Sequence, residues 1–458
     1  MAREKIKFKE KLGYTLFSGS TNIIFNFKSA YYLLFLTNIL NIPILTASTI
    51  LTIGTIWDAV NDPLIGFWSV NHKFKNGEKI RPMLLYFALP WAITIVLMFA
   101  DFKLSSVLTI AVCILIYLLF EAFYTFLCIP YNSMGAIATT DDDDRRSINS
   151  FRSLGSTLGS GIGTVAALPL VKLFGGLKEP DAIIGPGDAS ALLKTSILMA
   201  VLCIAGCLYH YFTCKERVHQ EASNDEKIGF FETFKMLFSI KSWVLNMAYI
   251  LFYGIDVAIV MNCVNYYAAY VLGASSMATP ILAVFLVIAV ISALIISLID
   301  KKLGRRKTMI FAAIVQVVTL IPFILFPHSI ITIFINAAGV GFGTTIAFIL
   351  FNTNRNNISD MVEFKYGRRI DSMVATCDNF ISKLGEAVAV QGMGLFLAWA
   401  GMDALLESNQ PESAINAIIA LLGIIPLIIC VLMGVFAAMN HIEEDYSIAK
   451  KAFEAKNN

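Results

Sequence analysis

The chain has 458 residues, of which 57% are hydrophobic and 15% are charged, and its mean hydropathy is +0.71. This is far more apolar surface than the core of a water-soluble protein of this length can bury, so lipid must be the solvent. The formal net charge of only +2 argues against a protein that binds nucleic acid. We therefore expect an all-α membrane protein, since the apolar runs are long enough to cross the bilayer as helices.

Twelve such runs follow one another along the chain. The first six lie near residues 14–40, 44–70, 83–100, 105–138, 150–175 and 191–214, and the other six lie near residues 243–271, 276–299, 308–326, 329–357, 371–400 and 412–439. The charged stretch from Lys215 to Lys227 separates the two sets. The acidic run from Asp141 to Asp144 precedes the fifth span and is interpreted as a solvated loop.

The order of these runs predicts two six-helix bundles. We expect an N-terminal bundle over residues 1–214, a cytoplasmic linker over 215–240, a C-terminal bundle over 241–440 and a cytoplasmic tail over 441–458. Basic residues crowd alternate connections, so the positive-inside rule places both termini in the cytoplasm of a multi-pass protein of the cell (inner) membrane. The first residues are charged and are not followed by an apolar core with a cleavage site, so no removable signal peptide is expected.

A short internal repeat relates the two sets of spans. Tyr31-Tyr32 closes the first span ahead of Pro43, and Tyr266-Tyr267 closes the seventh span ahead of Pro280. Two parallel repeats of six spans joined by a cytoplasmic linker are the layout of the major facilitator fold, whose central cavity holds the substrate between the halves.

The second span carries the acidic residues that are most costly to bury. Asp58 and Asp62 are four residues apart and therefore share one helix face, and Asn61 adds an amide oxygen beside them. Two carboxylates at this depth cost several kcal/mol unless a cation offsets them. A bound Na⁺ or a proton would do so, because a hard cation favours carboxylate and carbonyl oxygens. An ion pair with a basic residue is the alternative.

Three basic residues also fall inside apolar runs: Lys28 in the first span, Arg152 in the fifth and Lys383 in the eleventh. Each needs a partner or water. Lys383 could pair with the aspartates when no cation is bound, and Arg152 could donate to substrate hydroxyls or to a carboxylate. Snorkelling to the interface is the alternative.

Amides and aromatic rings accompany these charges. Asn22 and Asn26 lie one turn apart in the first span, and the seventh span carries Asp256, Asn262 and Asn265. Amides can bind sugar hydroxyls while rings cover the apolar faces of a sugar. The same residues could instead hold helices together.

The turn after the eighth span reads Asp300-Lys301-Lys302-Leu303-Gly304-Arg305-Arg306-Lys307. A carboxylate ahead of a basic cluster predicts a cytoplasmic latch that joins helices in one access state and releases them in the other. Positive charge that only fixes the orientation of the chain is the alternative.

Enzymatic chemistry is not indicated. The sequence has no catalytic constellation, no phosphate-binding loop and no metal-ligand spacing. The eight cysteines are interpreted as buried, reduced packing residues. We expect no enzyme and no cofactor beyond the co-transported Na⁺ or H⁺.

The sequence resembles the glycoside-pentoside-hexuronide:cation symporter family, a melibiose permease-like branch of the major facilitator superfamily. The resemblance spans nearly the whole chain and rests on Lys11-Leu12-Gly13-Tyr14, Trp57-Asp58-Ala59-Val60-Asn61-Asp62-Pro63, Arg81-Pro82, Ile129-Pro130-Tyr131-Asn132-Ser133, Asp360-Met361-Val362-Glu363 and Arg369 to Ser372. The Asp-x-x-Asn-Asp-Pro element is its most specific part. The resemblance implies a fold of twelve transmembrane helices.

The resemblance also implies the residues of two sites. A cation would bind at Asp58, Asn61, Asp62 and Thr125, with Lys383 close by; Na⁺, if it is the coupling cation, would be held as a metal by Asp58 and Asp62. The resemblance implies substrate contacts at Asn22, Tyr124, Cys128, Asn132 and Arg152, and the polar residues described above add Asn26, Lys28 and Lys383 as candidates. The candidate latch residues are Asp300, Arg305, Arg306, Asp360, Glu363 and Arg369.

The chain departs from melibiose-type permeases at the sugar site. Those permeases carry aspartates where this chain has Asn22 and Cys128, and a tryptophan where it has Asn132. Loss of two acids with Arg152 and Lys28 present makes the cavity less negative. This pattern favours an anionic glycoside such as a glucuronide, as in the glucuronide and pentoside branch.

We therefore expect a secondary active transporter that couples a sugar or glycoside to Na⁺, Li⁺ or H⁺ by alternating access. A lipid or lysolipid carrier, or an uncoupled sugar facilitator of the same fold, is the alternative. The expected partners are a small-molecule sugar, the coupling cation and membrane lipid, without nucleic acid, and the expected assembly is a monomer.

Overall fold

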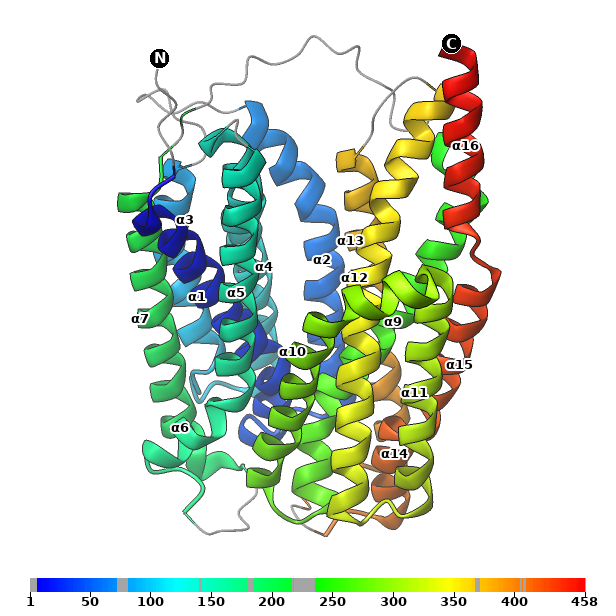
Figure 1. The fold of residues 1–458 in the computed structure, drawn as a ribbon. Coiled ribbons are helices and arrows are strands. Elements are labelled where there is room, and N and C mark those ends of the chain that lie inside the picture. Colours follow the sequence, from blue (N-terminus) through cyan, green and yellow to red (C-terminus); the bar gives the residue numbers. More distant parts are fainter. Residues whose placement is uncertain are drawn as a thin grey trace. The chain divides into compact units, whose positions relative to one another are not determined.

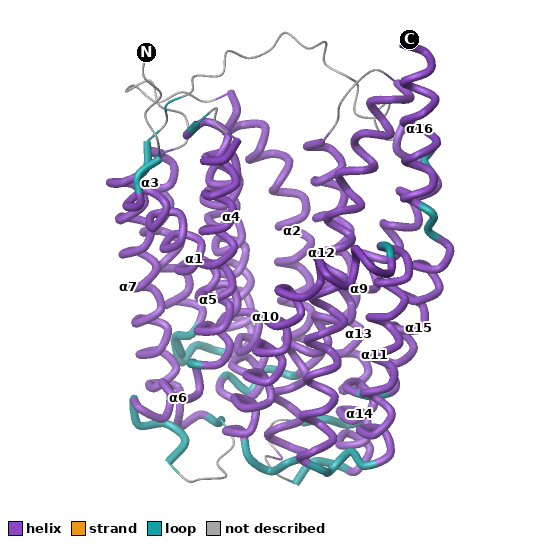
Figure 2. Tube along the Cα trace, in the orientation of Figure 1, coloured by secondary structure: helices purple, strands orange, loops and turns teal. Residues whose placement is uncertain are grey.

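The computed structural model describes residues 6–71, 81–139, 142–178, 184–215, 217, 235–366, 371–403, 406 and 409–457, and the regular elements in these ranges are all helices (Figures 1 and 2). Nine helices of this described part, or ten if the bent fifth span is counted, are long and apolar enough to cross a membrane. Two further long helices, α1 and α2, are not among the nine because polar side chains lower their hydropathy. These side chains are Asn22, Asn26 and Lys28 in α1 and Asp58, Asn61 and Asp62 in α2.

The chain divides into two units. Unit 1 comprises Met1–Ser223, Ala268–Pro280 and Leu397–Pro411, and unit 2 comprises Asn224–Tyr267, Ile281–Phe396 and Glu412–Asn458. The helices of unit 1 are α1 (Phe8–Leu34), α2 (Ile44–Asn71), α3 (Arg81–Met98), α4 (Ser106–Ala138), α5 (Asp142–Val165), α6 (Ala167–Leu173) and α7 (Ala189–Thr213), with the short elements η1 (Phe35–Ile39) and η2 (Pro186–Asp188).

Unit 2 has a similar set of helices. Its helices are α9 (Lys241–Tyr266), α10 (Ala278–Leu303), α11 (Arg305–Leu325), α12 (Ile330–Tyr366), α13 (Asp371–Trp399), α14 (Glu412–Leu422), α15 (Ile424–Met439) and α16 (Ile442–Asn457). The short elements η3 (Tyr267–Val271) and η4 (Ser275–Met277) connect α9 to α10 and, apart from Tyr267, belong to the Ala268–Pro280 segment of unit 1. If α5 with α6 and α14 with α15 are each counted as one span, each unit contributes six described spans, as the major facilitator fold requires.

A seam of small residues joins α1 to α5 in unit 1, where the two helices run side by side (Figure 1). Gly155, Gly159 and Gly163 follow one another at one-turn intervals along α5. A Cβ at these positions would overlap the carbonyl oxygens of Thr15, Gly19 and Ile23, respectively. Backbone therefore lies directly on backbone, a contact that glycines spaced by four allow in membranes.

The same close backbone contact at glycines recurs in unit 2 between α9 and α13. A Cβ at Gly254 would overlap the carbonyl oxygen of Ser382, and one at Gly385 would overlap that of Leu251. The first and fifth spans of unit 1 thus pair in the same way as the first and fifth spans of unit 2. Both α1 and α9 also continue into a π-helical turn, η1 and η3. The sequence repeat around the two tyrosine pairs therefore has a structural counterpart.

Two expected boundaries are wrong. The helix α5 begins at Asp142, so most of the acidic run expected to be a loop is its first turn, where negative charge is favourable. Asp144 Oδ2 also accepts a hydrogen bond from the backbone nitrogen of Ile6 at 3.2 Å. A break at Ala166 then bends the fifth span by 48° between α5 and α6.

The second error concerns the connection after the tenth span. α12 continues to Tyr366, so Asp360 and Glu363 are helical and do not lie in a loop. The C-terminal residues form α16, which packs against α12 (Figure 1), with the Phe364 ring 5.9 Å from that of Tyr446 and 5.0 Å from that of Phe453. Arg369 and most of the expected linker, residues 216 and 218–234, lie outside the described residues.

Candidate functional site

The carboxylates of the second span meet a hydroxyl from the fourth. Asp58 and Asp62 lie one turn apart on α2, which packs side by side with α4. Thr125 Oγ1 of α4 lies 3.2 Å from Asp58 Oδ1 and 3.0 Å from Asp62 Oδ1. Asp58 and Thr125 are buried, with 5% and 1% of their surface exposed. The structure therefore brings together three of the four residues expected to bind a cation.

Thr125 cannot satisfy all its neighbours at once. Its hydroxyl also lies 3.0 Å from the backbone oxygen of Glu121, yet it has one proton to donate. Its lone pairs, together with the two carboxylates, form a set of oxygens suited to a hard monovalent cation or a proton. The described residues contain no group of three or more histidine, cysteine or acidic side chains that could hold a metal ion.

Asn61, the fourth expected residue, is also buried, and it directly precedes Asp62 in the sequence. Its Nδ2 has no hydrogen-bond partner in the structure. Buried polar groups are nearly always hydrogen-bonded, so an unsatisfied amide indicates a place for a ligand. A 180° rotation of the amide would present Oδ1 in place of Nδ2. The oxygens of Asp58, Asp62 and Thr125 therefore fit a small cation, and Asn61 would add a fourth oxygen in the rotated orientation.

A buried ion pair lies next to this cluster. Lys28 Nζ of α1 is 2.8 Å from Glu121 Oε1 of α4, and their side chains are 5% and 2% exposed. Lys28 also donates to Tyr117 Oη at 3.2 Å and lies 4.6 Å from the centre of the Phe25 ring. Lys28, expected to contact substrate, thus pairs with Glu121, a residue that the sequence alone did not indicate.

Other candidate substrate residues of α1 bond to α5. Asn26 Nδ2 donates to Ser160 Oγ at 3.0 Å and to the Asn22 carbonyl oxygen at 2.9 Å. Asn22 Nδ2 donates to the Ser18 carbonyl oxygen at 2.8 Å, and its Oδ1 accepts from Ser160 at 3.5 Å. These amides therefore help to join two helices of unit 1.

The aromatic and basic candidates of unit 1 lie among rings. Tyr124 stacks on Phe25, with ring centres 5.2 Å apart, and its ring is 5.3 Å from that of Trp91. The Arg152 guanidinium lies 4.4 Å from the centre of the Tyr131 ring. Aromatic rings suit the apolar face of a sugar, and a guanidinium suits a polar substituent, although the two groups lie on different rings here. Cys128 is half-buried and the other seven cysteines are buried and unpaired, while the Asn132 side chain lies outside the described part.

The polar residues of the seventh span lie in unit 2. Asp256 is fully buried, and its Oδ2 accepts a hydrogen bond from Gln316 Nε2 at 2.7 Å. Asn262 Nδ2 donates to the carbonyl oxygen of Ala258 at 2.8 Å, and Asn265 is buried. Lys383 of α13 is half-buried and has an interaction partner of its own. Unit 2 therefore carries the acidic and amide side chains of the seventh span and the basic side chain of the eleventh span that the sequence indicated.

Asp300 and Arg305 of the expected latch lie where α10 turns into α11. Gly304 adopts φ +80°, which favours glycine, and lets the chain turn directly from α10 into α11. The backbone nitrogen of Arg305 donates to Glu443 Oε2 of α16 at 3.1 Å, and Arg305 Nη1 donates to Asn354 Oδ1 at 3.2 Å. Burial raises the pKa of Asp300; the Glu443 carboxylate also raises it, and the Arg305 guanidinium opposes both.

Glu443 was not anticipated, because its role depends on α16 folding back onto α11 and α12. Arg306, Asp360 and Glu363 are half-buried, and the two acids have interaction partners. A further ion pair joins Arg355 Nε to Asp378 Oδ2 at 2.6 Å in unit 2.

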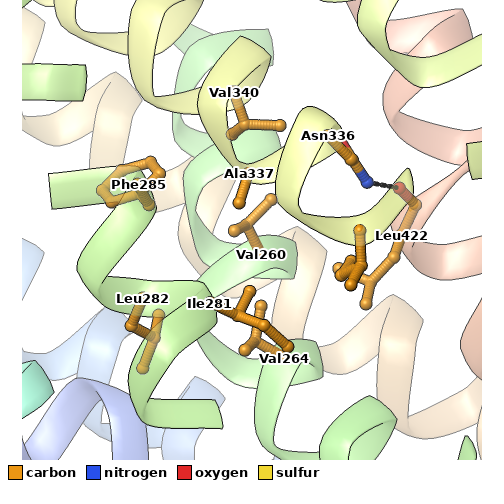
Figure 3. Close-up of a pocket in the computed structure, with 10 residues that line it drawn as sticks. Val260, Val264, Ile281, Leu282, Phe285, Asn336, Ala337, Val340 and Leu422 are labelled. Atoms are coloured by element: carbon orange, nitrogen blue, oxygen red, sulfur yellow. Dashed lines mark hydrogen bonds between the residues drawn. The ribbon is translucent and has the colours of Figure 1, made fainter. Parts of the chain in front are cut away.

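One pocket in the described part of unit 2 lies among α9, α10, α12 and α14 (Figure 3). Its lining is apolar apart from Asn336, whose Nδ2 donates to the Leu422 carbonyl oxygen at 3.0 Å. Such a lining offers a sugar almost no hydrogen bonds, so this pocket is not a candidate sugar site.

Comparisons with known proteins identify the family of the chain. The sequence profile of the family described as MFS/sugar transport protein matches residues 13–444. The chain is similar to the inner membrane symporter YicJ of Escherichia coli (strain K12), at 28% identity over 95% of this chain and 92% of that protein. It is also similar to the putative glycoside/cation symporter YagG of the same organism, at 26% identity over 93% of this chain and 90% of that protein.

Solved structures support the fold. A bacterial homologue of the human lysosomal transporter Spinster, in an inward-facing and unoccupied conformation, superposes with a TM-score of 0.65. The alignment covers 97% of each chain at 14% sequence identity. At this identity, the likeness is one of fold.

Proposed function

Because the chain belongs to the MFS/sugar transport protein family, we propose that it carries a sugar or glycoside across the membrane together with a cation, by alternating access. The family and the fold are those of membrane transporters and not of enzymes. We place both termini in the cytoplasm, because basic residues crowd alternate connections. The inner membrane is proposed because the relative YicJ is an inner membrane symporter, and a monomer is proposed as the simplest assembly.

The observation that carries the coupling proposal is the contact of one buried hydroxyl with two carboxylates. Thr125 Oγ1 lies within 3.2 Å of Asp58 Oδ1 and 3.0 Å of Asp62 Oδ1. Repulsion between the carboxylates and the burial of Asp58 both disfavour two ionised groups, so a cation or proton bound there is stabilised. We propose that Asp58, Asp62, Thr125 and Asn61 bind Na⁺, Li⁺ or H⁺.

The substrate proposal rests on the chemistry of unit 1 and on the relatives. Stacked rings at Tyr124 and a guanidinium at Arg152 suit a sugar. An anionic glycoside stays a prediction that depends on Arg152, since Glu121 offsets the charge of Lys28. A lipid carrier would need an apolar groove for an acyl chain, which these polar and aromatic groups do not favour.

Uptake into proteoliposomes tests the proposal. Labelled neutral and glucuronide-type aryl glycosides are offered to the wild type and to Asp58→Asn, with and without an imposed Na⁺ or H⁺ gradient. We expect accumulation driven by one gradient in the wild type, and equilibration without accumulation in Asp58→Asn. Asp58→Glu is the matched control, because it keeps the carboxylate.

Three other outcomes would contradict parts of the proposal. Equal, gradient-independent equilibration in both proteins would make this an uncoupled facilitator with a structural aspartate pair. Uptake of neutral and glucuronide-type glycosides at one rate, unchanged by Arg152→Gln, would remove the preference for an anion. A failure to transport any glycoside would favour the lipid carrier.

A further inference from the structure

We propose that Asp256 of α9 is a proton-binding site of unit 2, whose buried carboxyl group carries a proton in the folded protein. The site is separate from the proposed cation site, since no residue of unit 1 takes part in it. Its ligand is H⁺ whichever cation drives transport. The protein would therefore respond to pH even if Na⁺ is the coupling cation.

Asp256 is fully buried and has a single hydrogen-bond partner in the described part of the chain. Its Oδ2 accepts a hydrogen bond from Gln316 Nε2 of α11 at 2.7 Å, and its Oδ1 has no hydrogen-bond partner. Gln316 is confined in turn by α12, because a Cβ at Gly343 would overlap its Oε1 atom. Burying an unpaired carboxylate is far more costly than burying a neutral carboxyl group, so a bound proton is favoured.

The titratable groups near Asp256 supply no positive charge. They are the Tyr249 and Tyr253 hydroxyls of α9 and the Cys430 thiol of α15. Each of these groups is neutral when protonated and negative when it loses its proton, so none can neutralise a carboxylate. No ion pair in the described residues includes Asp256.

Charged side chains of the neighbouring helices have other partners or lie at helix ends. Arg355 of α12 pairs with Asp378 Oδ2 of α13 at 2.6 Å. Lys383 and Glu386 of α13 have interaction partners of their own. The charged residues of α11 and α14 lie in the first turn of each helix, and α15 has none. These first-turn residues are Arg305, Arg306, Lys307 and Glu412.

Asp256 is the last of a row of polar side chains on one face of α9. The spacings within the row alternate between four and three residues, which keeps the side chains on one side of a helix. The row consists of Ser242, Asn246, Tyr249, Tyr253 and Asp256. Val260 and Val264 continue the same face and line the apolar pocket (Figure 3). Polar groups therefore lead to Asp256 from the beginning of α9, while apolar groups follow it.

The outer end of this row reaches the protein surface. Ser242 Oγ donates a hydrogen bond to the Asp445 carboxylate of α16, and Asp445 is exposed. Asn246 Oδ1 accepts a hydrogen bond from Asn354 Nδ2 of α12 at 3.0 Å. Hydroxyl groups both donate and accept hydrogen bonds, and buried acids in membrane helices commonly take part in proton relays. We therefore expect Asp256 to exchange its proton with water at the beginning of α9.

Infrared spectroscopy would detect the proton directly, because a protonated carboxyl group has a C=O stretching band that a carboxylate lacks and that shifts in D₂O. Spectra of the full-length wild type and of Asp256→Asn would be recorded in nanodiscs at neutral pH, in H₂O and in D₂O. We expect the band in the wild type and its loss in Asp256→Asn. Asp378→Asn is the matched control, because it changes a buried aspartate of unit 2 that pairs with Arg355, and it should leave the band unchanged.

Gln316→Leu tests the same carboxyl group without removing it. Loss of the amide donor should move the band to a higher frequency, because the carboxyl group of Asp256 then has one hydrogen bond fewer. A band that belongs to another residue would not move. This variant also decides the question if Asp256→Asn does not fold.

Thermal unfolding gives a second readout. A proton that Asp256 holds in the folded protein and loses on unfolding stabilises the fold less as the pH rises, since the unfolded chain then binds fewer protons than the folded protein. From mildly acidic to mildly alkaline pH, the unfolding temperature of the wild type should therefore fall more steeply than that of Asp256→Asn.

Two results would overturn the proton site. If neither Asp256→Asn nor Gln316→Leu alters the band, Asp256 is ionised in the folded protein. If NaCl, compared with choline chloride at the same ionic strength, removes the band, the carboxylate binds Na⁺ in place of a proton. Neither measurement uses a sugar or a gradient, so both results would leave the proposed transport function standing.

Discussion

Thr125 is the residue at which the cation site can be weakened without a change of charge. Thr125→Val removes the hydroxyl that lies 3.2 and 3.0 Å from the two aspartates while keeping the shape of the side chain. A hydrogen bond to a charged group contributes about 1.5–3 kcal/mol, so we expect the Na⁺ or H⁺ concentration for half-maximal uptake to rise at least about tenfold. Thr125→Ser keeps the hydroxyl and should behave like the wild type; equal effects of both variants would contradict a role for the hydroxyl.

The residues of this site differ in how far the sequence could predict them. Asp58 and Asp62 follow from spacing alone, because residues four apart on a helix share a face. Thr125 came from family resemblance, since its contact with the aspartates depends on the packing of α2 against α4. Glu121 was missed because it is one acid within a long apolar run, and only the fold brings Lys28 of another helix to it.

At the scale of helices, the glycine seam of α5 gives a second prediction. Gly159→Ala places a Cβ against the carbonyl oxygen of Gly19, and backbone cannot move aside as a side chain can. Overpacking of this kind costs about 1–3 kcal/mol, so the unfolding temperature in detergent or nanodiscs should fall.

Gly392→Ala in α13 is the matched control for the seam. An added Cβ there meets no atom within 4 Å, and alanine favours a helix over glycine by roughly 1 kcal/mol. We expect its unfolding temperature to stay the same or rise. A similar loss in both variants would mean that the α1–α5 contact is not the cause.

The order of the helices could be predicted from hydropathy, but their ends could not. Hydropathy reports the part of a helix that lies in lipid, whereas α12 continues to Tyr366 and α5 begins at Asp142 in polar sequence. Polar spans are a second difficulty, since α1 and α2 are not among the helices apolar enough to cross a membrane, and both carry candidate site residues. The break at Ala166 has a local cause that hydropathy does not report, because Pro169 has no N–H to donate to the carbonyl oxygen of Val165.

At the scale of the whole molecule, coupling predicts a reciprocal effect on affinity. If one cation and one sugar bind the same protein and each favours the binding of the other, linkage requires the two effects to be equal. Isothermal titration should therefore find that a saturating cation lowers the dissociation constant of the sugar by the same factor by which saturating sugar lowers that of the cation. For typical coupling energies this factor is about 5- to 150-fold. An unchanged sugar affinity would leave symport without a thermodynamic basis.

The seams of α1 with α5 and of α9 with α13 also constrain how the protein can change shape. Where backbone lies on backbone, no side chain stands between the helices to change rotamer and accommodate sliding. Each helix pair is therefore expected to move as one rigid body within its unit. A displacement of α1, which carries Lys28, should therefore move α5, which carries Arg152, by the same amount.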